Sequence, residues 1–211
     1  MPVDVKICGL STPESVEAAL AAGADLVGFV FYPKSPRNVS LETAAALAAL
    51  ARGRAKIVTL VVDADDALLA AITSSVDPDL IQAHGHESPE RIARIKALTG
   101  KPVIKALSVR TEADVARARG YAAVPFILYD AKPPENSALP GGNGLTFDWT
   151  ILKTADRPLM LSGGLMPGNV AEAIRVTGAA MVDVSSGVES APGIKDVELI
   201  RKFIEAAKRA S

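Results

Sequence analysis

The chain has 211 residues, of which 49% are hydrophobic, which is enough apolar material for one large domain or two small ones. A formal net charge of -1 argues against a general nucleic-acid binder, because that function needs a basic face, but it allows a local anion site. One cysteine excludes an internal disulfide and a multi-cysteine metal site, and no apolar stretch is long enough to span a membrane. We therefore expect a soluble, cytoplasmic protein that binds neither nucleic acid nor membranes.

Short β-branched runs alternate along the chain with alanine-rich amphipathic runs. The short runs are nearly continuously apolar, which is typical of parallel strands that are covered on both faces. The gap between successive runs has room for one helix and two tight loops. The eight predicted strands are VDVKI from residue 3, LVGFV from 26, KIVTLVV from 56, LIQA from 80, VIKAL from 103, FILYD from 126, LMLS from 159 and MVDVS from 181.

Capping signals mark the ends of the intervening helices. Thr12-Pro13 and Ser88-Pro89 have the pattern of a helix N-cap followed by proline in the first turn. Glycines stand where helices are expected to stop, at Gly23, Gly100, Gly120 and Gly178.

Eight βα units in sequence predict a (β/α)8 barrel, or TIM barrel, that forms a single domain over residues 1–211. The alternative is a doubly wound open sheet, but eight strands at near-even spacing favour closure. The stretch AKPPENSALPGGNG after the sixth strand is too long for a simple turn and is rich in Pro, Gly and Asn. We predict that it is a mobile active-site loop.

Glycines and hydroxyls follow the last two predicted strands, in LSGGL and DVSSGVE. Gly163 and Gly164 let backbone N–H groups approach an anion without obstruction by a Cβ atom. Ser185, Ser186 and Gly187 add two hydroxyls, and we expect a short extra helix to begin there. Because barrels of this kind bind phosphate after strands 7 and 8, we predict a phosphate site, with ordinary βα turns as the alternative.

Other polar residues end the predicted strands, where barrel enzymes place their functional groups. Cys8 ends the first strand, Arg37 lies in the loop after the second, Asp130 ends the sixth and Asp183 lies in the eighth. They supply a thiol, a cation and two carboxylates. Packing is the common alternative for a lone cysteine, and a loop cap is the alternative for an aspartate.

Seven motifs that extend from residue 6 to residue 196 resemble the phosphoribosylanthranilate isomerase family of tryptophan biosynthesis. They are KICGL, GFVFYPKSPRNV, QAHG, FILYDAK, GGNGLTFDW, LSGGLMPGNV and DVSSGVESAPGIKD. The resemblance implies a TIM barrel, monomeric or homodimeric, that converts N-(5'-phosphoribosyl)anthranilate into 1-(2-carboxyphenylamino)-1-deoxyribulose 5-phosphate without a metal or an organic cofactor. Such an aldose-to-ketose rearrangement needs one acid and one base.

The resemblance also implies roles for four side chains. Cys8 matches the family's general base, and Asp130 matches its general acid, which must be protonated when the sugar ring opens. Arg37 matches the residue that receives the anthranilate carboxylate, for which a guanidinium fork has the right shape. Asp183 resembles an aspartate that hydrogen-bonds a substrate hydroxyl.

Five further residues receive no chemical role. We interpret Gln82 as barrel-lining, His84 as a rim or structural residue, and Lys105 as bound to a carboxylate inside the barrel instead of forming a Schiff base. Asp148 caps a helix or holds the glycine loop, and Tyr129 points away from the barrel interior.

Two other functions stay open at this point. A phosphosugar-binding barrel without isomerase activity would share the phosphate motifs, but it would not need a matched acid and base. A related isomerase with two sugar substrates is expected to have an aspartate where this chain has Cys8.

Overall fold

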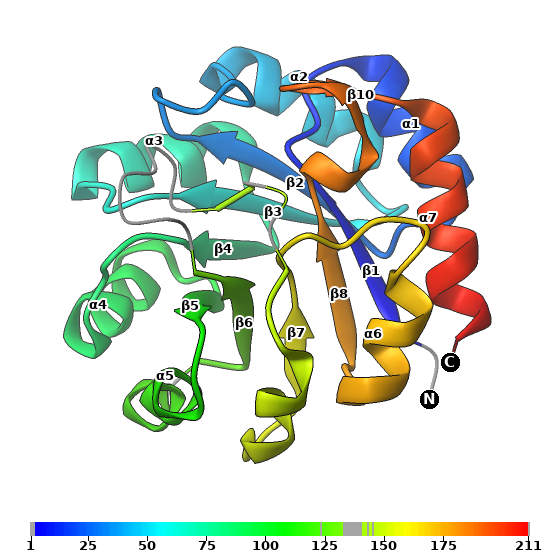
Figure 1. Cartoon of the computed structure of the whole chain (residues 1–211). Coiled ribbons are helices and arrows are strands. Elements are labelled where there is room, and N and C mark those ends of the chain that lie inside the picture. The colour runs from blue at the N-terminus through cyan, green and yellow to red at the C-terminus, as the bar shows by residue number, and fades with distance from the viewer. Residues whose placement is uncertain (1–2, 123, 133–140, 143, 145, 211) are drawn as a thin grey trace.

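The protein is a closed barrel of eight parallel strands, described here by a computed structural model for residues 3–122, 124–132, 141–142, 144 and 146–210. The strands are β1 (Asp4–Cys8), β2 (Leu26–Phe31), β3 (Lys56–Val61), β4 (Leu80–Ala83), β5 (Val103–Val109), β6 (Phe126–Ala131), β7 (Leu159–Leu161) and β8 (Met181–Val184). Each strand pairs with the next, and β1 also pairs with β8, with Lys6 opposite Asp183 (Figure 1). This closure confirms the predicted (β/α)8 barrel and excludes the open sheet.

Helices lie outside the barrel and connect its strands (Figure 1). They are α1 (Pro13–Ala21), α2 (Leu41–Ala51), α3 (Asp66–Val76), α4 (Pro89–Thr99), α5 (Glu112–Ala116), α6 (Val170–Thr177) and α7 (Val197–Arg209), with the 3-10 helices η1 (Arg117–Tyr121), η2 (Trp149–Thr154) and η3 (Ser186–Val188). Thr12 and Ser88 cap α1 and α4 as predicted, since each hydroxyl accepts a hydrogen bond from the N–H three residues later. Gly100 and Gly178 end α4 and α6 in the left-handed conformation. The prediction for Gly120 was wrong, because this residue lies within η1.

The connections after β5 and β6 depart from the expected pattern of one α-helix each. The helix α5 has only five residues and continues as η1, and the described part of the connection after β6 contains η2. Asp148 caps η2, as one of its two predicted roles required, because its Oδ1 accepts a 2.9 Å hydrogen bond from the N–H of Thr150. Most of the predicted active-site loop, residues 133–140 and 143, lies outside the described residues.

Apolar side chains form two clusters on opposite sides of the sheet. The smaller cluster fills the barrel and includes Leu26, Val58, Leu128 and Met160, each from a different strand. The larger cluster lies between the strands and the surrounding helices. Because successive side chains of a strand alternate between its faces, Tyr129 belongs to the outer cluster, as predicted.

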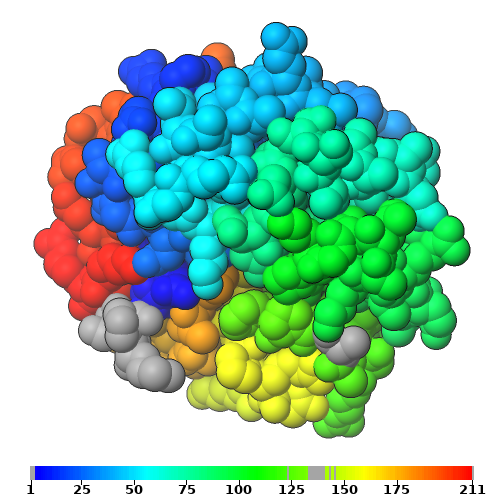
Figure 2. All heavy atoms as spheres, turned by 180° about the vertical axis from the view of Figure 1, so that it is seen from behind, coloured from blue at the N-terminus to red at the C-terminus, as the bar shows by residue number. Residues whose placement is uncertain are grey.

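The chain between β8 and α7 adds an antiparallel hairpin that the sequence did not predict. Its strands are β9 (Glu189–Ala191) and β10 (Ile194–Lys195). The helix α7 then packs against α1, so that the red C-terminal helix lies beside the blue N-terminal segment when the molecule is seen from behind (Figure 2). No helix in the described part of the chain is long and apolar enough to cross a membrane.

Candidate active site

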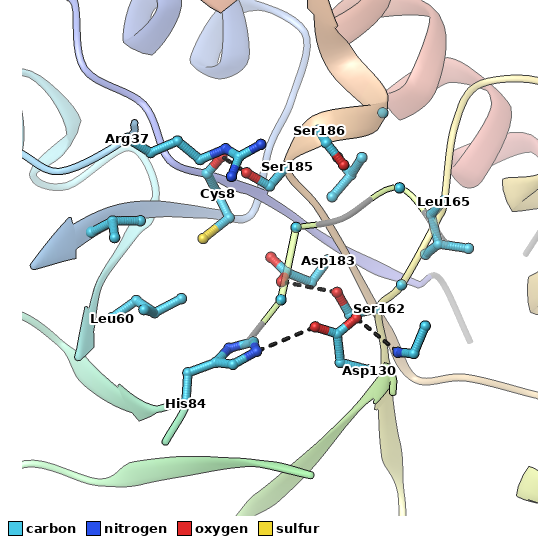
Figure 3. A pocket seen from close by; sticks show the side chains of 18 of the residues that line it. Cys8, Arg37, Leu60, His84, Asp130, Ser162, Leu165, Asp183, Ser185 and Ser186 are labelled. Atoms are coloured by element: carbon cyan, nitrogen blue, oxygen red, sulfur yellow. Dashed lines mark hydrogen bonds and ion pairs between the residues drawn. The ribbon is translucent and has the colours of Figure 1, made fainter. Parts of the chain in front are cut away.

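A cavity opens at the C-terminal ends of the barrel strands (Figure 3). It is lined by all nine residues that the sequence analysis selected, namely Cys8, Arg37, Asp130, Gly163, Gly164, Asp183, Ser185, Ser186 and Gly187. These residues come from β1, β6 and β8 and from the loops after β2, β7 and β8. The closed barrel therefore brings the two ends of the sequence to one site.

Cys8 is the last residue of β1, and its sulfur faces the cavity (Figure 3). The residue is only 3% exposed, and burial raises the pKa of its thiol, while the positive charge of Lys6 opposes this rise. Gly28 pairs with Cys8 from the neighbouring strand β2. A Cβ atom at Gly28 would lie 3.0 Å from the sulfur, so the glycine provides the space that the thiol occupies.

Asp183 forms a buried ion pair with Lys6, with 2.8 Å between Oδ1 and Nζ. Its other oxygen accepts a 3.4 Å hydrogen bond from the hydroxyl of Ser162. Burial lowers the pKa of Lys6, but Asp183 and Cys8 outweigh this effect and raise it above its ordinary value. Lys6 is therefore a permanent cation beneath the cavity at neutral pH.

Asp130 lies near the end of β6 with its carboxyl group in the cavity (Figure 3). Its Oδ1 accepts a 2.9 Å hydrogen bond from the N–H of Ala131, and its Oδ2 lies 3.2 Å from Nε2 of His84. The other ring nitrogen of His84 lies 2.9 Å from Nε2 of Gln82. A Cβ atom at Gly141 would lie 2.5 Å from Asp130 Oδ2, so this glycine lets the backbone cover the contact.

Arg37 is 6% exposed and binds Glu189, the first residue of β9. Its Nε and Nη2 donate two hydrogen bonds of 2.7 and 2.8 Å to the carboxylate, and Lys195 Nζ lies 2.7 Å from the same group. Burial raises the pKa of Glu189, but the two cations outweigh this effect and hold it below its ordinary value. Two cations thus share one carboxylate, and Nη1 of Arg37 lies beside Gly142, where an added Cβ would be 2.8 Å away.

The segments after β7 and β8 bring their backbones close together through glycine. Gly163 has a φ of +90°, and a Cβ atom there would lie 2.5 Å from the backbone nitrogen of Ala131. A Cβ atom at Gly187 would overlap the carbonyl oxygen of Leu165. The short helix expected here is η3, which has three residues. The hydroxyl of Ser185 donates a 3.1 Å hydrogen bond to the carbonyl oxygen of Cys8, which joins the end of β1 to this segment.

The two histidines have different surroundings. His84 lines the cavity, whereas the side chain of His86 is 95% exposed and lies 3.2 Å from Asp63. Among the residues that the structure describes, no group of three or more His, Cys, Asp or Glu side chains is arranged to hold a metal ion.

Comparison with known proteins agrees with this geometry. Residues 5–206 match the family model of N-(5'-phosphoribosyl)anthranilate (PRA) isomerase. The chain belongs to the PRA isomerase family. As a member of that family, it is an isomerase.

Individual PRA isomerases match the chain over nearly its full length. The enzyme of Azorhizobium caulinodans is 59% identical, and the alignment covers 100% of this chain and 93% of the relative. A crystal structure of monomers generated from the dimeric enzyme of Thermotoga maritima is 38% identical, with a TM-score of 0.84 and coverage of 98% and 99%. A PRA isomerase in complex with reduced 1-(o-carboxyphenylamino)-1-deoxyribulose 5-phosphate is 37% identical, with a TM-score of 0.85 and the same coverage.

In the present chain, Lys105 lies on the outer face of the barrel, which corrects its predicted location inside the barrel. Its neighbour Ile104 belongs to the inner cluster, so alternation along β5 turns Lys105 toward the helices. The predicted carboxylate partner is confirmed, because Nζ lies 2.8 Å from Glu87 and also donates a 2.8 Å hydrogen bond to the carbonyl oxygen of Gly85. The amine does not line the cavity, which argues against a Schiff-base role.

The sequence analysis missed three charged residues of this site, which are Lys6, Glu189 and Lys195. All three lie inside motifs that were recognised, in KICGL and DVSSGVESAPGIKD. A signal was available for Lys6: it interrupts an apolar strand two residues before Cys8, and this spacing places both side chains on one face. The other two required the hairpin β9–β10, which the sequence did not predict. Gln82 is buried on β4, on the same face of the strand as Leu80 of the inner cluster, as the barrel-lining interpretation requires.

Proposed function

We propose that the protein isomerises N-(5'-phosphoribosyl)anthranilate to 1-(2-carboxyphenylamino)-1-deoxyribulose 5-phosphate in tryptophan biosynthesis, with Cys8 as general base and Asp130 as general acid. One observation carries the proposal: a buried thiol from β1 and a buried carboxyl group from β6 line the same cavity. The family match and the related complex with a reduced form of this product support the choice of substrate.

The reaction begins with the opening of the furanose ring. Asp130 gives a proton to the ring oxygen as the bond from C1 to that oxygen breaks, and the anthranilate nitrogen forms a C=N bond to C1. Cys8, as the thiolate, then removes the proton from C2, which gives an enolamine with a C1=C2 bond. The enolamine gains a proton at C1 and loses the hydroxyl proton at C2, and this exchange yields the ketone and restores both catalytic groups.

The surroundings of Asp130 suit a group whose charge changes during the reaction. His84 Nε2, at 3.2 Å, donates a hydrogen bond to the carboxylate in one tautomer and accepts one from the carboxylic acid in the other. The amide of Gln82 can serve Nδ1 in either case, because rotation exchanges its donor and its acceptor. We therefore give His84 a positioning role next to the acid, instead of the rim role that the sequence suggested.

The same cavity offers a partner for each end of the substrate. Arg37 receives the anthranilate carboxylate, a role supported by the excess of positive charge around Glu189. The backbone of Gly163 and Gly164 and residues 185–187 bind the phosphate, which is the usual position in such barrels. Asp183 accepts a hydrogen bond from a ribose hydroxyl.

We further propose that the protein works in the cytoplasm as a monomer or a homodimer. The lone cysteine is typical of a reducing compartment, and the related Thermotoga protein is described as dimeric. Light scattering on the purified protein decides the assembly, and a mass above that of two chains would overturn it.

The direct test mixes the purified protein with freshly prepared N-(5'-phosphoribosyl)anthranilate and no added metal. We expect rapid loss of anthranilate fluorescence, formation of the ketose by NMR, and a rate reduced roughly 10²- to 10⁴-fold in Asp130→Asn. A folded wild type that binds the reduced product but leaves the substrate unchanged would instead establish a phosphosugar-binding barrel.

A further inference from the structure

Lys6 is a charged residue with no exposed surface, placed directly beneath the active-site cavity. It precedes Cys8 by two positions on β1, so both side chains point into the barrel. Its ammonium lies 2.8 Å from Asp183 Oδ1, and Asp183 itself lines the cavity. A buried charge of this kind is costly unless it is paired, and here the pair lies next to the catalytic thiol.

The side chains of Lys6 and Cys8 share one space. A Cβ atom at Gly28 would lie 3.0 Å from the sulfur of Cys8 and 3.1 Å from Cε of Lys6, so both chains reach the same point on β2. The ammonium of Lys6 is therefore close enough to the sulfur of Cys8 for their charges to interact. The interaction is favourable for the thiolate: burial raises the pKa of Cys8, and Lys6 is the largest influence in the opposite direction.

The other charged groups around the thiol are weaker or already neutralised. Asp183 from β8 disfavours the thiolate, and Lys195 from β10 favours it less than Lys6 does. Lys195 and Arg37 both bind Glu189, which offsets part of their charge. Among the described residues, the cavity is also lined by the titratable side chains of Tyr32, Asp130 and His84, of which the last two hydrogen-bond to each other.

We propose that Lys6 is a positioning residue that determines how much of Cys8 is thiolate, and that Asp183 tunes this effect by drawing the ammonium toward itself. The inference rests on the proposed function only in giving the thiolate its use as a base. It predicts opposite consequences for the two partners. Loss of Lys6 removes the cation that stabilises the thiolate. Loss of Asp183 removes a competing anion, so that the ammonium of Lys6 stabilises the thiolate more strongly.

The test titrates Cys8 directly in the whole protein, by the ultraviolet absorbance that a thiolate has and a thiol lacks. Cys8 is the only cysteine in the chain, so Cys8→Ser supplies the complete baseline. We expect the midpoint of the titration to move to higher pH in Lys6→Met and to lower pH in Asp183→Asn. Shifts in the same direction, or no shift in Lys6→Met, would overturn the proposal.

Two further variants keep the test decisive. Lys6→Met leaves Asp183 buried without its partner, so if that variant does not fold, Lys6→Met/Asp183→Asn replaces it and must titrate at higher pH than Asp183→Asn. Lys105→Met/Glu87→Gln is the matched control, because it removes another buried lysine–carboxylate pair, on the outer face of the barrel. It must leave the midpoint unchanged; a shift as large as that of Lys6→Met would contradict a specific effect.

The titration needs no turnover, so its result is independent of whether the wild type isomerises the substrate. Activity then gives a second measure: the acid limb of the pH profile of kcat/KM must move with the midpoint of the thiolate titration. A thiolate midpoint that shifts while this limb stays in place would separate Lys6 from the proposed chemistry.

Discussion

Replacing Arg37 by lysine tests the assignment of the carboxylate end of the cavity. Lysine keeps the positive charge but has no planar fork. In the wild type, Nε and Nη2 are held by Glu189, so the fork is fixed and Nη1 is left beside Gly142 for the proposed contact with the substrate carboxylate. An ammonium group pairs with Glu189 as a point charge and leaves no donor fixed in direction for a second carboxylate.

The magnitude follows from the loss of one hydrogen bond between charged groups. Such a bond contributes about 1.5–3 kcal/mol. Since each 1.4 kcal/mol corresponds to a factor of about ten in binding, kcat/KM should fall by roughly 10- to 100-fold in Arg37→Lys. Most of the change should appear in KM, because the carboxylate is remote from the reacting carbons and is bound equally in the ground state and the transition state.

A substrate that lacks the carboxylate makes the assay specific. With N-(5'-phosphoribosyl)aniline, the kcat/KM of the wild type should fall by about the same factor as the mutation causes with the natural substrate. Arg37→Lys should have nearly the same kcat/KM with the two substrates. Glu189→Gln is the matched control, because it keeps Arg37 and replaces the carboxylate that holds both Arg37 and Lys195, so it should retain a preference for the carboxylated substrate. If Arg37→Lys still prefers the carboxylated substrate by the wild-type factor, Arg37 does not bind the carboxylate.

Three other predictions concern the barrel around the site. Lys105→Met leaves the carboxylate of Glu87 buried without its cation, so the free energy of unfolding in urea should fall by about 3–5 kcal/mol, and Lys105→Met/Glu87→Gln should recover part of it. Gly28→Ala places a methyl group 3.0 Å from the sulfur of Cys8, and we expect a destabilisation of about 1–3 kcal/mol together with a loss of kcat; full activity would show that the thiol has room to move. His84→Asn should lower kcat roughly tenfold through the loss of a hydrogen bond of about 1.5 kcal/mol to the acid, with little change in the calorimetric Kd of the reduced product; an unchanged kcat would remove His84 from the mechanism.

The barrel could be predicted from the sequence because its strands are short, apolar and regularly spaced. Local rules also located the first residues of α1 and α4, where a hydroxyl residue precedes proline. The site followed from the fold, since residues near the C-terminal ends of barrel strands gather at one cavity whatever their distance in sequence. Cys8 and Asp130 met this condition, and both line the cavity.

The ion pairs could not be predicted in this way. Lys6 and Asp183 are 177 positions apart and Arg37 and Glu189 are 152 apart, so no local pattern relates the partners. Lys105 shows a different limit: its burial and its carboxylate partner were foreseen, but the face of β5 on which it lies depends on the register of the barrel.

The most direct test of the account is the single-turnover rate at which Cys8→Ser consumes N-(5'-phosphoribosyl)anthranilate, measured with enzyme in excess. Serine is close in shape to cysteine but has no accessible anionic form at neutral pH. The account predicts a rate at least about 10²-fold below that of the wild type, with an unchanged Kd for the reduced product. A variant that binds this ligand normally and turns over at a rate near the wild-type value would contradict the role of Cys8 as the base.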